Sequence, residues 1–185
     1  YSSEGSELLD RIAVLRRQYD QQLGFPMPAV KVSKAQSIGD QEYEIHLLGS
    51  RFTASDIFPD RVLAIGDRKF DPGMEGIDTV DPSFGIPAIW IDPKNADSAK
   101  AVGFKIVDPI TVIITHLSEI LSGEMAMLLN RTMVIQILDG VRERQPGLVE
   151  ELVPNILSYS DVQRVFQHLI AEGVSIAHAD VIAEH

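Results

Sequence analysis

Adjacent hydroxyl and imidazole side chains are the first candidates for chemistry in this sequence. Thr115 and His116 form such a pair within an apolar run, and a histidine close to a nucleophile can act as its general base. In an apolar helix, however, such a pair more often lies on the helix surface with a satisfied histidine. The five histidines of the chain are scattered, and none has a partner at the helical or hairpin spacing that a metal ion requires.

The sequence contains none of the common catalytic motifs. There is no G-x-S-x-G nucleophile turn, no glycine–lysine phosphate loop, no G-x-G-x-x-G fingerprint and no H-E-x-x-H metal motif. There is also no cysteine, which excludes disulfides, thiolate metal ligands and a cysteine nucleophile. We therefore expect a protein that is not an enzyme and that holds neither a metal nor a cofactor.

A stretch rich in glycine and aspartate, residues 66–79, is the other candidate for binding chemistry. Its acidic residues loosely suggest a calcium loop: Asp67, Asp71, Glu75 and Asp78. An EF-hand needs alternating ligands, a central glycine and a terminal glutamate, and the spacing here differs. We expect a loop without a metal. We also expect His46 to face water or to pair with a neighbouring carboxylate.

The stretch from Thr79 to Leu117 holds the most informative turn. Asp81–Pro82 favours a turn, because the residue before a proline avoids the α region. Phe84–Gly85 follows where the chain leaves that turn and enters a strand. A large ring at a turn is either buried in a core or exposed as a partner contact. Residue statistics alone favour the buried position, because exposed hot-spot aromatics are rarer.

Composition excludes several classes of protein. Of the 185 residues 45% are apolar, so the chain can bury a substantial core and is not disordered. Its formal net charge is −11, and so acidic a surface repels phosphate backbones, which argues against nucleic acid as a partner. No apolar run reaches the roughly 20 residues that span a bilayer, and no signal-peptide pattern begins the sequence. We expect this piece to be soluble.

Hydrophobic periodicity predicts a mixed first half. The expected elements are a helix over 7–22, a strand over 29–33, a loop over 34–41, and a hairpin whose strands, 42–48 and 51–57, meet at Gly49–Ser50. After a break at Phe58–Pro59–Asp60 come strands over 61–65, 86–91 and 104–107, with helices over 93–102 and 109–121. This alternation implies at least one crossover connection.

Beyond Gly123 the pattern is helical. Apolar residues recur at helical spacing over 124–129, 132–143, 147–153, 160–172 and 175–184. Ser160 and Gln163 have the spacing of a capping box. The last helix ends at His185 without a glycine cap, so we expect the sequence to stop inside a domain.

Longer motifs resemble a known family. In chain order they are ELLDRIAVLRRQ, LGFPMPAVKV, FPDRVLAIG, VDPSFGIPAIWI, GFKIVDPITVIITHLSEIL, LLNR, ILDG, LVEELVPNILS, VQRVFQHLIAEGVSI and VIAEH. This set spans nearly the whole chain. It resembles the cytoplasmic part of the FHIPEP family, the large export-gate proteins of type III secretion, and is closer to the flagellar than to the virulence branch.

The resemblance implies an α+β fold with a mixed α/β first subdomain, a small inserted α/β subdomain and a helical subdomain. The first would be residues 1–59 plus 109–123, the inserted second 60–108, and the helical third 124–185. The third would be truncated here and a fourth would be missing. These boundaries agree with the changes of sequence pattern at Phe58–Pro59 and Gly123.

The resemblance also implies partner-binding residues. In flagellar members, a depression between the first two subdomains binds export chaperones that carry their cargo. An aspartate and a phenylalanine in a D-P-x-F motif and a threonine in a T-H-L motif act there. Matched by motif, these are Asp81, Phe84 and Thr115, with Ile86 as an apolar neighbour. Phe84 would then be an exposed ring, with an acid and a hydroxyl at the rim to orient the partner.

The implied function is a non-enzymatic docking platform for export chaperone–substrate complexes. The platform would lie at the cytoplasmic face of the bacterial inner membrane and would reach the membrane only through an N-terminal transmembrane part that is absent here. It would join a homo-oligomeric, nonameric ring and contact other export-apparatus proteins. The alternative is a purely structural module that assembles or spaces the ring.

Overall fold

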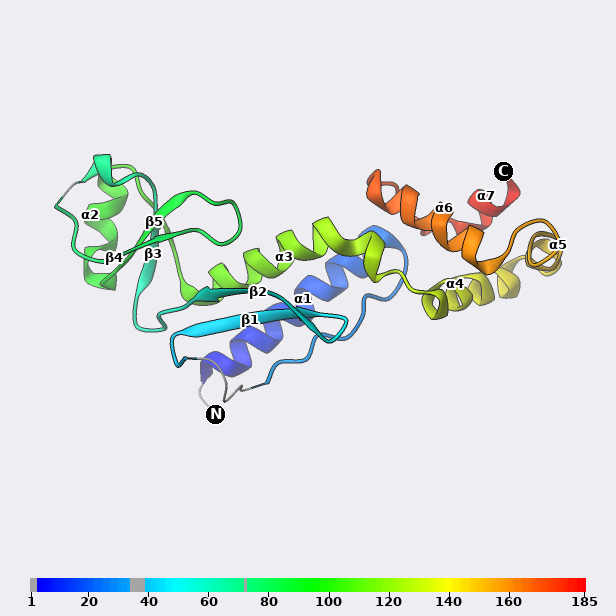
Figure 1. The fold of residues 1–185 in the computed structure, drawn as a ribbon, viewed down its shortest axis with the longest axis horizontal. Helices are drawn as coiled ribbons and strands as arrows, with labels where there is room; N and C mark the ends of the chain where they lie inside the picture. Colours follow the sequence, from blue (N-terminus) through cyan, green and yellow to red (C-terminus); the bar gives the residue numbers. More distant parts are fainter. Residues whose placement is uncertain (1–2, 34–38, 72) are drawn as a thin grey trace. The chain divides into compact units, whose positions relative to one another are not determined.

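The computed structural model describes residues 3–33, 39–71 and 73–185 (Figure 1). Most of the loop expected over 34–41 lies outside the described residues. The chain forms two compact units: unit 1 comprises Tyr1–Arg11 and Val32–Glu119, and unit 2 comprises Ile12–Lys31 and Ile120–His185. Unit 1 combines two small sheets with helices, and the α+β class is confirmed.

A two-stranded antiparallel sheet begins unit 1. It pairs β1 (Glu42–Leu47) with β2 (Ser50–Asp56). The turn consists of Leu48 and Gly49, with φ of 51° and 82°, and not of Gly49–Ser50 as we expected. Both central residues of this turn have positive φ, which matches the right-handed twist of hairpin strands. The predicted strand over 29–33 is wrong, because these described residues belong to neither a helix nor a strand.

Leu48 is an unfavourable residue for its turn position. A left-handed conformation costs a leucine about 1–2 kcal/mol, and Asn-Gly is the preferred pair for such a turn. Leu48→Asn is therefore expected to stabilise the protein by about 0.5–1 kcal/mol, measured by urea unfolding. Leu48→Ala is the matched control, because the side chain is 68% exposed and alanine keeps the strain. Equal stability of the two variants would contradict this explanation.

A four-stranded sheet forms the other half of unit 1. Its order is β4-β5-β3-β6, with β3 at Val62–Ile65, β4 at Ile77–Val80, β5 at Pro87–Ile91 and β6 at Lys105–Val107. Both β5 and β6 are antiparallel to β3, so they run parallel to each other. The connection between them passes through α2 (Ala96–Ala101), which confirms the predicted crossover.

The sequence failed to predict β4. The first three of its four residues, IDTV, lie within the glycine- and aspartate-rich stretch 66–79 that we expected to be a loop throughout. At the start of β4, a Cβ on Gly76 would lie 2.5 Å from the carbonyl oxygen of Trp90. Gly76 therefore permits a close approach to β5. In the sequence this glycine indicates a loop, but in the structure it makes strand pairing possible.

Alternate residues of the four-stranded sheet bury two different faces. One face packs Ala64, Ile89 and Ile91 against Ala99 of α2 and Phe104, as Figure 1 shows for the helix. The opposite face packs Leu63, Ala88 and Trp90 with Ile57 and with Val112 of α3 (Pro109–Leu128). Because both faces are covered, the short strands read as continuous apolar runs.

Two helices contribute residues to both units: α1 (Ser3–Leu23) and α3. The sequence predicted a boundary between helices at Gly123, but α3 continues through it. Buried side chains on either side, Leu121 and Met125, offset the weak helical propensity of glycine. By length and composition α3 could cross a membrane, contrary to our expectation. Packing of its buried side chains also accounts for its apolar character.

Helices build the rest of unit 2: α4 (Arg131–Arg144), α5 (Leu148–Leu152), α6 (Tyr159–Ala171) and α7 (Ala179–Glu184). The capping box of α6 uses Ser158 and Asp161, so the predicted pair Ser160 and Gln163 is wrong. Gln163 and Gln167 instead donate hydrogen bonds to the carbonyl oxygen of Leu129.

The segment before α7 packs closely against the end of α1. The amide of Ile176 donates to the carbonyl oxygen of Leu23 at 3.1 Å, and Ile176 is buried. Gly24 ends α1 with φ of 80°. A Cβ on Gly24 would lie 2.1 Å from the Cα of Ala177, so the position requires glycine for both its conformation and its space.

Candidate functional site

The connection between β4 and β5 places three of the predicted site residues in one tight loop, residues 80–86, which we call the Phe84 loop. The amide of Asp81 donates to the carbonyl oxygen of Ile86 at 2.8 Å, and the amide of Gly85 donates to that of Asp81 at 2.9 Å. The Oδ2 atom of Asp81 accepts the amide of Phe84 at 2.8 Å. Asp81 therefore fixes the backbone on which Phe84 and Ile86 stand.

Apolar side chains of this loop face solvent. Phe84 is 58% exposed, Val80 54% and Ile86 44%. The buried position that residue statistics favoured for Phe84 is wrong. Three hydrogen bonds hold the backbone of this loop, while the ring of Phe84 stays exposed.

The carboxylate of Asp81 is buried, with only 4% of the residue exposed, so it does not lie at the rim as the sequence analysis expected. It lies close enough to Tyr43 of β1 and His116 of α3 for its charge to act on both. Tyr43 Oη and His116 Nδ1 are 2.7 Å apart, and the two rings meet edge to face with centroids 5.8 Å apart. His116 is also buried, so the position on the helix surface that we expected for it is wrong.

Burial dominates the protonation of this pair. It lowers the pKa of His116, and the charge of Asp81 opposes that shift. Burial also raises the pKa of Tyr43, and Asp81 adds to that rise while a hydrogen bond with Ser55 opposes it. Burial therefore favours the protonated phenol of Tyr43 and the neutral imidazole of His116. Which of the two groups donates in their hydrogen bond depends on the imidazole tautomer.

Thr115, the fourth predicted site residue, is half-buried on α3. Successive residues of a helix point about 100° apart, so Thr115 faces another direction than the buried His116. The helix that carries both is fixed at its start by Asp108, whose Oδ2 accepts the amide of Thr111 at 2.9 Å. Arg11 of α1 donates to the Thr111 hydroxyl at 2.9 Å.

Sequence reasoning missed the role of Tyr43. Strict alternation over 42–48 placed Tyr43 with Ile45 on one strand face, which is a signal for burial. No local pattern connects Tyr43 to a histidine 73 residues away. His46 lies beside Glu44, with Nε2 and Oε2 2.9 Å apart, and its predicted pairing with a neighbouring carboxylate is confirmed.

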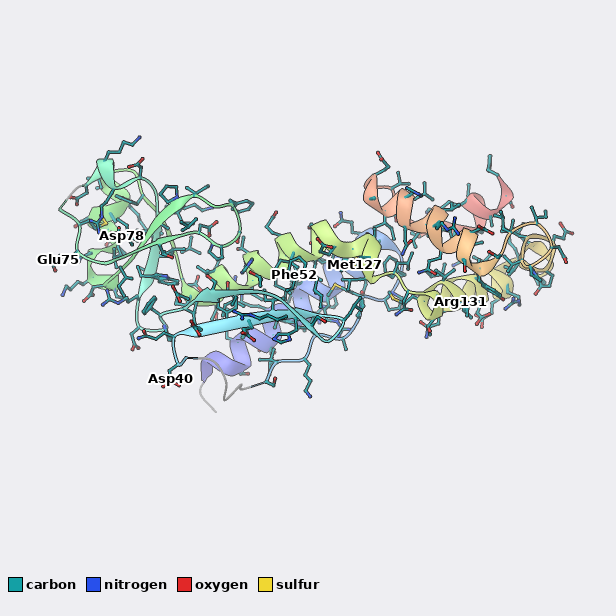
Figure 2. All side chains as sticks on the ribbon, viewed as in Figure 1. Asp40, Phe52, Glu75, Asp78, Met127 and Arg131 are labelled. Carbon is teal, nitrogen blue, oxygen red and sulfur yellow. The ribbon has the colours of Figure 1, made fainter. Side chains whose placement is uncertain are left out.

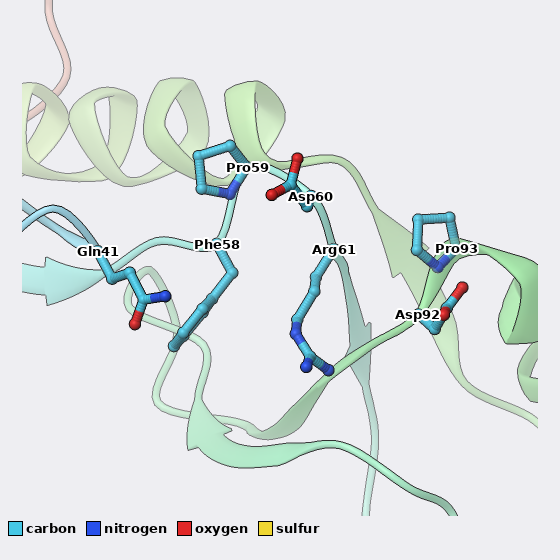
Figure 3. Close-up of a pocket in the computed structure, with 7 residues that line it drawn as sticks. All are labelled: Gln41, Phe58, Pro59, Asp60, Arg61, Asp92 and Pro93. Atoms are coloured by element: carbon cyan, nitrogen blue, oxygen red, sulfur yellow. The ribbon is translucent and has the colours of Figure 1, made fainter.

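A separate cavity of about 400 Å³ lies at the start of β3. In Figure 3 the side chains of Phe58 and Arg61 extend in the same direction, with Asp92 beyond Arg61. Arg61 donates to the carbonyl oxygen of Trp90 at 3.4 Å. The lining residues are Gln41, Phe58, Pro59, Asp60, Arg61, Asp92 and Pro93. This set contains no histidine, lysine or hydroxyl side chain that would form a nucleophile–base pair.

Three of the four acidic residues of the 66–79 stretch interact with neighbouring basic groups or amides. Asp78, labelled with Glu75 in Figure 2, pairs with Arg68 at 2.8 Å, and Asp67 pairs with Lys69 at 3.0 Å. Asp71 accepts the amide of Gly73. Across the described parts of the chain, no three acidic, histidine or cysteine side chains are grouped so that they could hold a metal ion.

The chain is thus an α+β protein that exposes an aromatic side chain on a hydrogen-bonded loop. Comparison with known proteins gives the family. The FHIPEP family matches residues 1–185, and the chain belongs to it.

Curated relatives are flagellar. The flagellar biosynthesis protein FlhA of Bacillus subtilis is 37% identical over 183 residues, which is 99% of this chain and 27% of that protein. The chain thus spans about a quarter of the length of the curated relatives it matches.

Solved structures show the same fold. The Chlamydia pneumoniae CdsV protein in complex with CdsO matches 95% of this chain and 54% of that chain, with a TM-score of 0.74 and 24% identity. Nonameric EPEC SctV-C matches 100% of this chain and 55% of that chain, with a TM-score of 0.66 and 19% identity.

Proposed function

We propose that this chain is a non-enzymatic docking platform of a flagellar export gate and that it binds export chaperone–cargo complexes at the Phe84 loop. The observation that carries the proposal is the position of Phe84. Its ring is 58% exposed, yet its own backbone amide donates to the buried carboxylate of Asp81.

The physical argument concerns preorganisation. A partner that covers an exposed phenylalanine gains roughly 25 cal/mol for each Å² of apolar surface removed from water. If the loop is already ordered, little of that gain is lost to fixing the backbone. The neighbouring Ile86 and Val80 extend the apolar surface. An amphipathic helix of a chaperone would lay its apolar face on these side chains.

The four predicted residues have different roles in this proposal. Phe84 and Ile86 contact the partner directly. Asp81 holds the loop in position from the protein interior, since its carboxylate is buried. Thr115, half-buried on α3, offers a hydroxyl to the partner at the border of the site. The subdomain division into 1–59 plus 109–123, 60–108 and 124–185 belongs to the same proposal.

The remaining parts of the proposal concern assembly and location. The whole protein would form a homo-oligomeric ring on the cytoplasmic side of the inner membrane, as the nonameric assembly of EPEC SctV-C suggests. It would contact other export-apparatus proteins, as the CdsV–CdsO complex suggests. The energy for export would come from other components.

Calorimetric titration tests the docking function. Purified flagellar export chaperones, each tested alone and in complex with its cargo, are titrated into this chain. We expect saturable binding of at least one complex, and weaker binding of the same chaperone alone. Sedimentation run in parallel is expected to show a mostly monomeric chain. If no complex binds and the chain self-associates instead, the structural ring module replaces the docking platform.

A further inference from the structure

The geometry points to Tyr43 and His116 as positioning residues for the Phe84 loop, which act through Asp81 and make docking depend on the protonation of His116. This inference rests on the proposed docking function for its biological meaning. Its structural part, the coupling of His116 to the Phe84 backbone, can be measured without a partner.

The coupling combines two hydrogen bonds with the charge of the buried Asp81. Tyr43 and His116 are joined at 2.7 Å, and the charge of Asp81 acts on both side chains. The same carboxylate accepts the amide of Phe84 at 2.8 Å. The buried carboxylate of Asp81 therefore interacts electrostatically with Tyr43 and His116, and it also holds the backbone of the Phe84 loop.

Burial makes this arrangement sensitive to a single proton. A carboxylate removed from water is stable only while its interactions are satisfied, and partly satisfied buried networks are costly. In the proposed resting state His116 is neutral with its proton on Nε2, and Nδ1 accepts the Tyr43 proton. Among the described residues, the titratable groups shown to act on His116 are Tyr43 of β1 and Asp81 of the loop.

A proton on Nδ1 changes both interactions. The imidazolium can no longer accept from Tyr43, because both of its ring nitrogens are then donors. Its positive charge attracts the Asp81 carboxylate in competition with the Phe84 amide. We expect the hydrogen bond to Phe84 to weaken and the loop to become less ordered. A less ordered loop binds a partner more weakly, because ordering must then be part of binding.

The direction of the pH dependence follows from burial. Burial lowers the pKa of His116, so the folded protein takes up this proton less readily than the unfolded chain. The stability that comes from neutral His116 is fully present above its ordinary pKa of about 6.5. It is lost as the pH falls from there through the lower folded-state value. Docking affinity is expected to fall in the same direction.

Amide NMR of the isolated chain tests the coupling. We expect the amide signals of Phe84 and Gly85 to shift with the same pH midpoint as the imidazole of His116. In His116→Asn the Oδ1 atom replaces Nδ1 as the acceptor for Tyr43, and the shared transition disappears. His46→Asn is the matched control, because His46 is exposed and paired with Glu44, and it leaves the transition unchanged.

Tyr43→Phe gives a second, opposite change. Without the phenol, neutral His116 loses its hydrogen-bond donor, so its midpoint is expected to move to higher pH, and the Phe84 amide to follow it. The inference would be overturned if the amide chemical shifts of Phe84 and Gly85 did not change through the His116 transition in the wild-type chain. That result needs no variant, so it stands even if a substitution prevents folding.

Binding measurements separate this inference from the proposed function. With a chaperone–cargo complex that binds at pH 7.5, affinity is expected to fall by at most about fivefold by pH 5.5 in the wild type if the His116 pKa differs by one unit between the free and the bound chain. It is expected to stay nearly constant in His116→Asn. If no complex binds but the Phe84 amide follows His116, docking fails and the coupling stands. Equal pH dependence in both proteins would overturn the coupling.

Discussion

Phe84→Ala is expected to weaken the binding of chaperone–cargo complexes about 30-fold, which is the loss of about 2 kcal/mol typical of an aromatic hot spot. The same change should shift the melting temperature by less than about 3 °C, because surface substitutions rarely cost more than about 0.5 kcal/mol. The ring is 58% exposed, so its removal leaves little cavity. Calorimetric titration and thermal unfolding measure the two effects.

Two controls separate the ring from its surroundings. Ser83→Ala changes the same loop; among the described residues, the buried Oγ of Ser83 has no hydrogen-bond partner, so affinity and stability should be retained. Val102→Ala removes another apolar side chain, 44% exposed, outside the loop. Unchanged affinity in Phe84→Ala, together with a large fall in melting temperature, would mean that the ring serves the core and that the docking site lies elsewhere.

Gly24→Ala is expected to cause the largest loss of stability. The added methyl group would lie 2.1 Å from the Cα and 2.4 Å from the amide nitrogen of Ala177, and backbone atoms cannot rotate away as a flexible side chain does. The segment around Ile176 would have to leave the end of α1. Exposing Ile176 and straining a left-handed residue together cost about 3–5 kcal/mol. This cost corresponds to a fall of about 6–20 °C in melting temperature.

Gly173→Ala is the matched control for this effect. Gly173 also has positive φ, at 74°, but a Cβ there would meet nothing within 4 Å. It carries the conformational strain alone, about 1–2 kcal/mol. If the two variants had the same melting temperature, the contact with Ala177 would not contribute to the loss of stability. The difference between them reports how firmly the segment before α7 is held in unit 2.

The sequence predicted elements well where one pattern decided the structure. Alternation over 42–48 identified β1, and the apolar run over 86–91 identified β5. It failed where tertiary contacts overrode a local signal. Gly123 does not interrupt α3, because its buried neighbours hold the helix, and Gly76 does not prevent β4, because it allows β5 to approach.

The candidate site could likewise be predicted only in part from the sequence. The D-P-x-F motif identified the loop, and the hydrogen bond from Phe84 to Asp81 is the kind that an aspartate at a turn makes. Exposure of the ring could not be obtained from residue statistics, because burial depends on what else packs nearby. The pairing of Tyr43 with His116 joins β1 to α3, and such long-range contacts leave no local trace in one sequence.

An uncovered aromatic surface also affects how separate copies of the chain meet in solution. Apolar side chains such as Phe84 and Ile86 would promote sticking between molecules, but each molecule carries a net charge of −11 and repels its like at a distance. This repulsion reaches about 10 Å in 0.1 M salt and about 3 Å in 1 M salt. Ionic strength therefore sets colloidal stability. In low-salt buffer, repulsion between the charged molecules keeps these exposed apolar side chains apart.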